Sequence, residues 1–428
     1  MSVAARTTRW LLIVISIWAM IFALHFSSIG GQWWPLETAT WALMVVWVWI
    51  YALSYLLAAR WRERVPSVAI QPTAWWNGWV AATSVAASAG ALLIIYEFAI
   101  LRGYGFATPV SLVRIAEVES GGGGSWVSGI GRMLSPALLV GWIMAVLGWS
   151  AVRPPVRLLL VGATGLVFYQ QAMFEGGRFF FASLLSASVV ARLFAPVASA
   201  RPRRLNITGK LALAVLFVLA VVVFGYVFVD RAAASEIAFG DAYALFVSDL
   251  RLELGHDLLA KLDGPAGAVW FASSMLWTYV THAMSELDVL LREPNLVHAY
   301  GLYQFPQLGQ LLTKMTGASY GYDVFSQLPS PGMYVTLYGA SYIDFGHAGA
   351  MVTAVTLGAV TGKAMRHLAS GRFAAFGLAA PLLWTVGLFA PITSVVTNLW
   401  PAMIWCVFIG LTAATRTVSA KAASVPAV

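Results

Sequence analysis

The sequence contains few charged residues and almost no cysteine. Only 10% of its 428 residues are charged, whereas a soluble domain has about 25%. The single cysteine, Cys406, excludes an intrachain disulfide and a cysteine-ligated metal site. Hydrophobic residues make up 60% of the chain, which indicates a protein surrounded by lipid.

Apolar runs of roughly 20 residues recur along the chain, long enough to cross a hydrocarbon core of about 30 Å. Backbone groups in lipid must be satisfied within each segment, so the runs are predicted to be helices. The alternation of a membrane β-barrel is missing. The predicted fold is an all-α, polytopic transmembrane bundle of about ten spans, with interfacial or re-entrant helices in a long outer loop. The predicted spans are 10–29, 38–59, 75–100, 133–152, 157–174, 179–196, 211–229, 345–365, 373–396 and 400–415.

The charges predict how these spans are oriented. With ten spans, most of the 26 basic residues fall on the side of the two termini, and of the 18 acidic residues only Glu63 does. The positive-inside rule makes that side cytoplasmic. We therefore expect a bacterial inner-membrane protein whose excess of positive charge faces the headgroups of membrane lipids and not nucleic acid.

The chain is predicted to be one membrane domain, residues 1–428. Its outward-facing segment, 230–344, has too many charges for lipid and too many aromatic residues for a disordered loop. Within it, Ala268 to Met284 is apolar and is expected to lie in the interface or dip back into the bundle, because a crossing would move the following basic residues outside. Residues 416–428 are expected to form a flexible cytoplasmic tail.

Two short stretches could bind an anion at the outer face. The turn Glu175-Gly176-Gly177-Arg178 combines a guanidinium fork with glycines that allow close approach of a phosphate. A plain helical hairpin turn with an interfacial arginine explains it equally well. Arg231 and Arg251 belong to the second region, in which Asp249 to Asp263 is predicted to be an amphipathic surface helix. A plain solvated face is the default interpretation of this helix.

A third region, Trp277 to Tyr303, carries several ionisable side chains. His282 and Glu286 are four residues apart and share a helix face. Such groups can accept a proton from a sugar hydroxyl, although a solvated face is the alternative. No third ligand with convincing spacing supports a metal. The other candidates here are Asp288, Arg292, His298 and Tyr300.

The fourth region, Pro329 to Gly349, places Tyr338, Tyr342, Asp344 and His347 where the chain re-enters the bilayer. Tyrosines there are also typical of an aromatic belt. A carboxylate at a helix entrance is often an N-cap.

These motifs together resemble Wzy-type oligosaccharide repeat-unit polymerases over roughly residues 160 to 365. The similar features are Tyr334-Val335-Thr336-Leu337-Tyr338-Gly339 with Tyr342 and Asp344-Phe345-Gly346, the Gly176-Gly177-Arg178 turn, the stretch from Trp277-Thr278-Tyr279 through Asp288, and Gly301 to Pro306. Val335 departs from the spacing of the family.

The resemblance implies transfer of a growing glycan from undecaprenyl diphosphate to the non-reducing end of a new lipid-linked repeat unit. It implies no metal or other cofactor, and a flippase and a chain-length regulator as partners. The expected base is among His282, Glu286, Asp288 and Asp344. The expected substrate-binding residues are Arg178, Arg292, Arg231, Arg251, His298, Tyr300, Tyr338, Tyr342, Glu175 and His347.

Four alternatives remain open at the level of sequence, one of which is a purely structural membrane partner. An O-antigen-ligase-type transferase would differ in its acceptor. A flippase or transporter is expected to place ionisable groups near the middle of spans, whereas Glu97 and Arg192 lie near span ends. A metal-dependent polyprenyl-phosphate-sugar transferase would need an acidic pair in the first outer loop, which has only Glu37.

Overall fold

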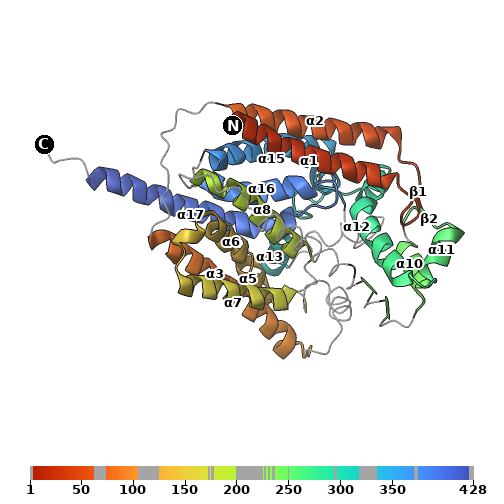
Figure 1. Ribbon diagram of the computed structural model, residues 1–428, viewed down its shortest axis with the longest axis horizontal. Helices are drawn as coiled ribbons and strands as arrows, with labels where there is room; N and C mark the ends of the chain where they lie inside the picture. Colours follow the sequence, from red (N-terminus) through yellow and green to blue (C-terminus); the bar gives the residue numbers. More distant parts are fainter. Residues whose placement is uncertain are drawn as a thin grey trace.

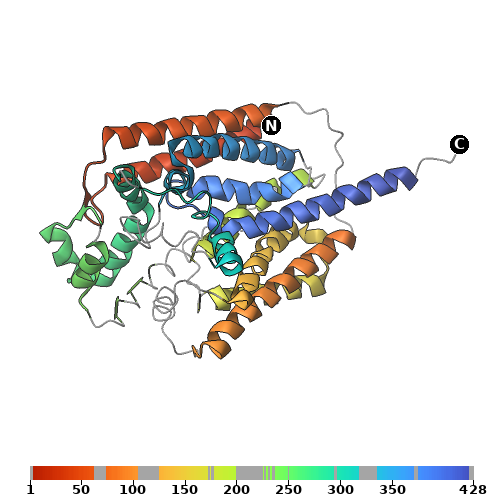
Figure 2. The same ribbon diagram turned by 180° about the vertical axis from the view of Figure 1, so that it is seen from behind.

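The fold is an elongated bundle of helices with a smaller helical cap across one end (Figures 1 and 2). The computed structural model describes residues 3–61, 74–104, 125–171, 174, 178–198, 225, 228–229, 232–233, 237–248, 250–293, 296–317, 335–370 and 375–423. The bundle helices are α1 (Val3–His25), α2 (Thr38–Arg60), α3 (Ala74–Ile95), α5 (Trp126–Leu134), α6 (Ala137–Leu147), α7 (Pro154–Gln170), α8 (Arg178–Ala198), α15 (Leu337–Ala369), α16 (Ala375–Phe389) and α17 (Val396–Ala423).

Five helical stretches in the described residues are long and apolar enough to cross a membrane. They are α1, α2, α3 with its π-helical extension η1 (Tyr96–Leu101), α5 with α6, and α15. Shorter apolar helices lie within α8, α16 and α17. The predicted all-α fold, with several helices long and apolar enough to cross a membrane, is therefore confirmed, whereas a count of ten spans is not. Most of the predicted span 211–229 lies outside the described residues, and α17 is helical over residues 416–423, where an irregular tail was predicted.

The two ends of the bundle differ in charge. Helix α1 begins near the end of α2, because the Tyr55 hydroxyl donates to the Thr7 carbonyl at 3.0 Å. Helices α3 and α7 begin at the same level, because the Asn77 side chain accepts a hydrogen bond from the Arg153 amide. We call this the basic end, and its described basic residues are Arg6, Arg9, Arg60, Arg153, Arg157, Arg192, Lys363 and Arg366. We call the opposite end, with the cap, the acidic end. The acidic residues that the structure describes lie in elements at or near the acidic end. These residues are Glu37, Glu97, Asp241, Glu253, Asp257, Asp263, Glu286, Asp288, Glu293 and Asp344.

Helices α2 and α15 run parallel and in close contact, because glycines of α15 leave no side chain between them. A Cβ at Gly358 would lie 2.4 Å from the Tyr51 carbonyl oxygen, and one at Gly362 would lie 2.2 Å from that of Tyr55. Small residues four positions apart allow this approach of two backbones in membranes. The candidate site at the acidic end lies at the first turns of these two helices.

Buried tryptophans join the helices of the bundle through their indole N–H groups. Trp18 donates to the Gly387 carbonyl, Trp47 to Ala350 and Trp76 to Met144, at 2.9, 3.0 and 3.0 Å. A buried indole N–H without a partner is costly, so these bonds fix the pairing of helices that would otherwise touch only through apolar side chains.

The cap consists of β1 (Gln32–Trp33), α10 (Phe239–Val247), β2 (Leu252–Glu253), α11 (His256–Leu262) and α12 (Gly267–Leu291). Strands β1 and β2 pair antiparallel, with Trp33 opposite Leu252. The prediction of one amphipathic helix over 249–263 is therefore wrong: pairing with β1 draws residues 252–253 into a strand, and the helix begins at His256. Helix α12 runs across the end of the bundle and not along it (Figure 1).

Two anchors attach the cap to the bundle. The Trp277 indole of α12 donates to the Leu24 carbonyl at 2.8 Å, and the Tyr243 hydroxyl of α10 donates to the Gly30 carbonyl at 2.7 Å. Trp33 also donates to Thr281. The end of α1 and the chain that follows it are thus held beneath α12.

The buried carboxylate of Glu97 is accounted for by local structure. It accepts hydrogen bonds from Arg102 at 2.6 Å and from the Ser125 and Ser128 amides at 3.1 and 2.8 Å. It therefore caps the beginning of α5 and lies at the end of its span, which disfavours a role in a central transport path.

Candidate functional site

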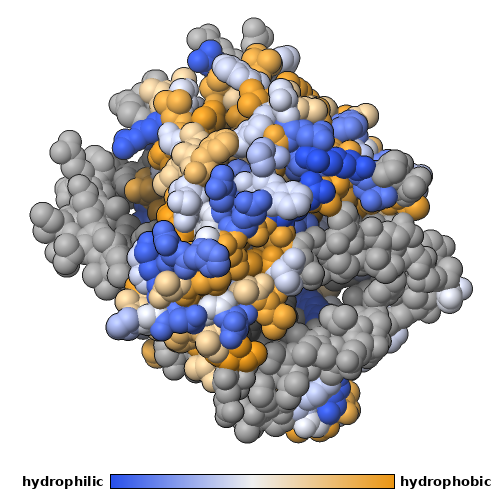
Figure 3. Space-filling view, turned by 90° about the vertical axis from the view of Figure 1, so that its right-hand side faces the viewer, coloured by the Kyte–Doolittle hydropathy of each residue, from blue (hydrophilic) through white to orange (hydrophobic). Residues whose placement is uncertain are grey.

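The predicted site residues that the structure describes lie mainly at the acidic end. Figure 3 faces this end and shows hydrophilic residues in patches between hydrophobic ones. The second half of α12 packs there against the first turns of α15, in an apolar cluster that includes Leu290, Ala340 and Ile343. Asp288, Asp344 and His347 on these two helices belong to three distinct arrangements, and His282 and Glu286 are enclosed apart from them.

Asp288 forms the first arrangement, a charge network at the beginning of α2. Its Oδ1 accepts the Glu37 amide at 2.9 Å and the Thr40 hydroxyl at 2.6 Å. Its Oδ2 accepts from the guanidinium of Arg292, and Arg251 lies 3.8 Å away. Arg292 also pairs with Glu37 at 3.1 Å. Asp288 therefore caps α2 from a distant part of the chain and pairs with two arginines, so both of its carboxylate oxygens are occupied by groups of the protein.

Asp344 forms the second arrangement, in which it organises the chain after α12. Its carboxylate accepts the backbone amides of Gly301, Tyr303 and Gln304 at 3.0, 2.9 and 3.2 Å. The preceding residue, Tyr300, has a φ of 50°, a left-handed conformation that costs energy for a side chain other than glycine. Asp344 is fully buried and supports this strained turn, on which Tyr300 is 78% exposed.

His282 and Glu286 are enclosed, because every residue from 281 to 288 is buried. The alternative of a solvated face is therefore wrong for residues 281–288 of α12, which are buried between the bundle and the rest of the cap. His282 Nδ1 lies 2.9 Å from the Thr278 carbonyl, and burial lowers the pKa of His282 to about 4. Burial is the main cause that raises the pKa of Tyr303 above its ordinary value, and the charges of Asp344 and Glu286 add to this effect.

The third arrangement is a cluster of two histidines and two tyrosines, His298, Tyr338, Tyr342 and His347, which we call the histidine–tyrosine cluster. The Tyr338 hydroxyl lies 2.7 Å from His347 Nδ1. The ring of Tyr342 lies between the histidines, with its centroid 4.7 Å from that of His347 and 6.0 Å from that of His298. Tyr338 is buried, Tyr342 and His298 are half-buried and His347 is exposed.

A break in α15 brings this cluster together. Tyr338 and His347 are nine residues apart, and on an uninterrupted helix they would point to opposite sides, because nine residues are about two and a half turns. Gly346 has φ 68° and ψ −168°, a conformation essentially restricted to glycine. The break reorients His347 toward the first turns of the helix. A Cβ at Gly346 would also lie 3.2 Å from His298 Nε2.

Two arginines lie at the same end and retain exposure. The side chains of Arg292 and Arg251 are 37% and 33% exposed, and the Arg251 guanidinium lies 5.9 Å from the ring centroid of Trp34. Each guanidinium has five N–H donors, so pairing with a carboxylate leaves capacity for a further anion. Arg178 begins α8, but its side chain lies outside the described residues, as do Glu175, Arg231 and Tyr334.

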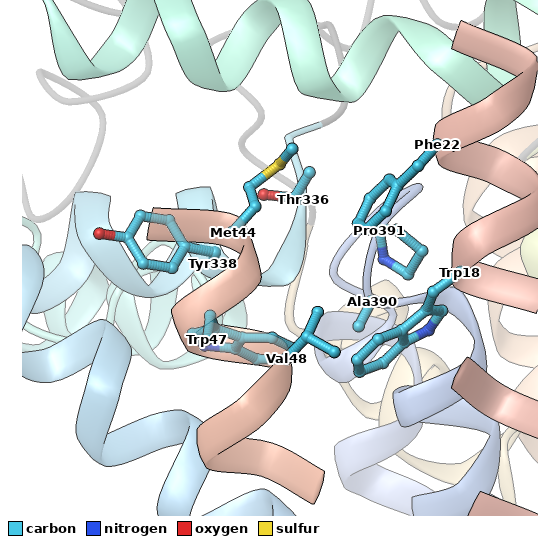
Figure 4. Close-up of a pocket in the computed structure, with 9 residues that line it drawn as sticks. All are labelled: Trp18, Phe22, Met44, Trp47, Val48, Thr336, Tyr338, Ala390 and Pro391. Carbon is cyan, nitrogen blue, oxygen red and sulfur yellow. The ribbon is translucent and has the colours of Figure 1, made fainter. Parts of the chain in front are cut away.

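A small apolar pocket adjoins Tyr338 between α1, α2 and the end of α16 (Figure 4). Its volume is about 20 Å³, room for roughly one water molecule or a methyl group. The figure shows the tyrosine hydroxyl pointing away from the pocket. The pocket is lined by Trp18, Phe22, Met44, Trp47, Val48, Thr336, Tyr338, Ala390 and Pro391.

No protein-family model, curated protein or solved structure matches the chain. Within the described residues, no group of three or more histidine, cysteine, aspartate or glutamate side chains is placed to hold a metal ion. The chemistry of the site therefore rests on the geometry of its side chains.

Sequence reasoning found the members of the cluster but not how they are connected. It placed His347 among the binding residues and looked for the base among four residues that the structure shows to be buried. The signal that could have identified His347 is the sequence Asp344-Phe345-Gly346-His347, since a glycine beside a histidine in an otherwise helical run marks a place where the helix can break. Thr40 of α2 donates a hydrogen bond to Asp288, and no feature of the sequence around Thr40 indicates this contact.

Proposed function

We propose that the protein transfers a glycan from a polyprenyl diphosphate carrier to a sugar hydroxyl at the acidic end of the bundle, and that it thereby polymerises lipid-linked repeat units. The single observation that supports this most strongly is the bond between Tyr338 and the exposed imidazole of His347. An oriented imidazole at a protein surface that adjoins the membrane is the group a sugar hydroxyl needs in order to attack.

In this proposal His347 is the general base. In the tautomer in which Nδ1–H donates to the Tyr338 oxygen, Nε2 keeps its lone pair and can accept a proton. The acceptor hydroxyl oxygen forms a bond to the anomeric carbon of the donor glycan, and its proton passes to Nε2. The bond between that carbon and the diphosphate oxygen breaks, and its electron pair leaves with the lipid diphosphate.

Arg292 and Arg251 are the proposed partners of the diphosphate. Charge accumulates on the leaving oxygens as the bond breaks, and guanidinium groups fixed in advance stabilise it without rearrangement. The Asp288 network supplies this fixation, since Asp288 and Glu37 hold Arg292 from two sides. Asp288 and Asp344 thus act as positioning residues in the proposal.

The aromatic residues provide the binding surface for the sugar. Tyr342 lies against His347, and Tyr300 stands exposed on the turn held by Asp344. Flat aromatic faces next to polar groups match the alternating apolar and hydroxylated faces of a pyranose ring. The proposal therefore assigns His298, Tyr300 and Tyr342 to the acceptor unit.

Deletion of the gene followed by analysis of lipid-linked and surface glycans tests the proposal. A polymerase predicts single repeat units that accumulate on the lipid carrier. Full-length chains retained on the carrier would instead indicate a ligase, and loss of outward-facing lipid-linked sugar would indicate a flippase. Either result contradicts polymerisation.

Complementation with variants then tests the residues. His347→Ala should reduce polymer by about 10²-fold or more, whereas His256→Gln, which changes an exposed histidine of the cap, should restore normal chains. Arg292→Ala should also shorten the chains, and Lys261→Ala in the cap is its matched control. Normal chain lengths with Arg178→Ala would remove Arg178 from the set of diphosphate ligands.

A further inference from the structure

At the basic end, α2 and α15 enclose a lateral groove of about 410 Å³ that the proposed reaction does not use. It begins beside the close contact of Gly358 and Gly362 with α2. The portion nearer the middle of the bundle is mainly apolar, with Leu57 and Ala58 on α2 and Val355 and Ala359 on α15, and Ser54 is the polar residue that the structure places there.

The portion nearer the helix ends is basic. Lys363, Arg366 and His367 line it from α15, and Trp61 lines it from the end of α2. The Lys363 ammonium lies 5.1 Å from the ring centroid of Phe376, which fixes it at this level of the bundle. Among the described residues that line the groove there is no aspartate or glutamate.

Arg366 supplies an independent indication of a ligand. Its Nη1 is buried and makes no hydrogen bond to any described residue. A buried charged donor requires an acceptor, and the groove beside it is the space from which an anionic oxygen can reach it.

The order of these groups along the two helices matches the order of groups in a phospholipid. Apolar walls at 355 and 359 are followed toward the helix ends by cations at 363 and 366, with Trp61, which is 71% exposed, at the outer limit. Tryptophan at this position is typical of the membrane interface. A free phosphate would satisfy the cations but leave the apolar half of the groove unused.

We propose that this groove binds one anionic phospholipid of the surrounding bilayer, with the phosphate between Lys363 and Arg366 and the start of an acyl chain along Val355 and Ala359. The lipid would extend the contact between α2 and α15 beyond Gly362 to the ends of both helices. Since α15 carries the histidine–tyrosine cluster at its other end, the lipid stabilises the helix on which the site is built.

Native mass spectrometry of the purified full-length chain tests the proposal, with phosphatidylglycerol and phosphatidylcholine of the same acyl chains added in equal amounts. We expect one tightly retained phosphatidylglycerol, bound at least fivefold more strongly than phosphatidylcholine. Lys363→Gln combined with Arg366→Gln should remove this preference. Arg192→Gln, which removes an exposed charge at the same end outside the groove, should change it by less than twofold.

Two further measurements distinguish a bound phospholipid from a bound small anion. Ala359→Leu fills the apolar half of the groove without altering its charge, so it should weaken the binding of phosphatidylglycerol at least threefold. If the double variant fails to fold, this variant alone decides between the two kinds of ligand. Equal binding of both lipids, or a preference that survives both substitutions, would overturn the proposal. Complete displacement of phosphatidylglycerol by millimolar inorganic phosphate would also overturn it, because the groove would then be a site for small anions.

Discussion

The hydroxyl of Tyr338 lies 2.7 Å from Nδ1 of His347, although the two residues are nine positions apart on what would otherwise be one helix. This relationship depends on the glycine break at position 346, and it places an oriented imidazole beside Tyr342, whose ring also contacts His298. The site is thus a property of the interrupted α15 and not of any single motif.

Removal of the Tyr338 hydroxyl should impair the reaction without removing the base. In Tyr338→Phe the imidazole loses the bond that orients it, worth about 1 kcal/mol, so kcat should fall roughly fivefold. KM should stay unchanged, because the tyrosine is not proposed to touch substrate. Tyr96→Phe, a change at an exposed tyrosine of η1, is the control. A rise in KM at constant kcat would show that Tyr338 binds substrate and does not position His347.

Substitution of the glycine at the break should destabilise the protein. Gly346→Ala forces a side chain into a glycine-only conformation and toward His298 Nε2, at a cost of about 1–3 kcal/mol. Thermal unfolding in detergent should show a lower midpoint. Gly162→Ala is the matched control, because a Cβ there has no neighbour within 4 Å. An unchanged midpoint for Gly346→Ala would mean that α15 can straighten at no cost.

The contact between α2 and α15 should not tolerate a methyl group. Gly362→Ala places Cβ against the Tyr55 carbonyl, and separation of the helices should cost about 1–3 kcal/mol. The expected result is a lower yield of monodisperse protein and a lower unfolding midpoint than for Gly78→Ala, where a Cβ would meet no neighbour within 4 Å. Equal behaviour of the two variants would contradict the parallel packing.

His282 should make stability depend on pH. Burial lowers its pKa to about 4 in the folded protein, whereas an unfolded histidine titrates near 6.5. Because the unfolded chain binds the proton more readily, this contribution is complete above pH 6.5 and is lost as the pH falls toward 4, by up to about 3 kcal/mol. Unfolding midpoints measured from pH 7.5 to 4.5 should decline less steeply for His282→Gln. Parallel profiles would show that His282 is accessible to protons in the folded state.

The bundle could be predicted from the sequence because lipid leaves few alternatives to a helix. Every apolar run that falls in the described residues forms one, including α1, α2 and α15. The cap was harder to predict, since residues 252–253 become a strand only through pairing with β1, more than 200 residues earlier in the chain. Local pattern cannot reveal such a partner.

The candidate site was predictable as a set of residues but not as a set of roles. The density of polar groups near 338–347 predicted a site there, and the structure brings Tyr338, Tyr342 and His347 into contact. From the sequence, Asp288 was a candidate base. In the structure its carboxylate accepts hydrogen bonds from the amide of Glu37 and the hydroxyl of Thr40, which are both far away in the chain. Burial of His282 likewise follows from tertiary packing, which the four-residue spacing to Glu286 does not encode.

The most direct test of the proposed function uses the purified protein in liposomes with synthetic undecaprenyl-diphosphate-linked repeat units. Glycan length and released undecaprenyl diphosphate are measured together. We predict that the native chain lengthens the glycan and releases one lipid diphosphate for each unit added, that His256→Gln does the same, and that His347→Ala does neither at a measurable rate. Lengthening by His347→Ala at the native rate would contradict the assignment of the base, and no lengthening by the native chain would contradict the proposed polymerisation.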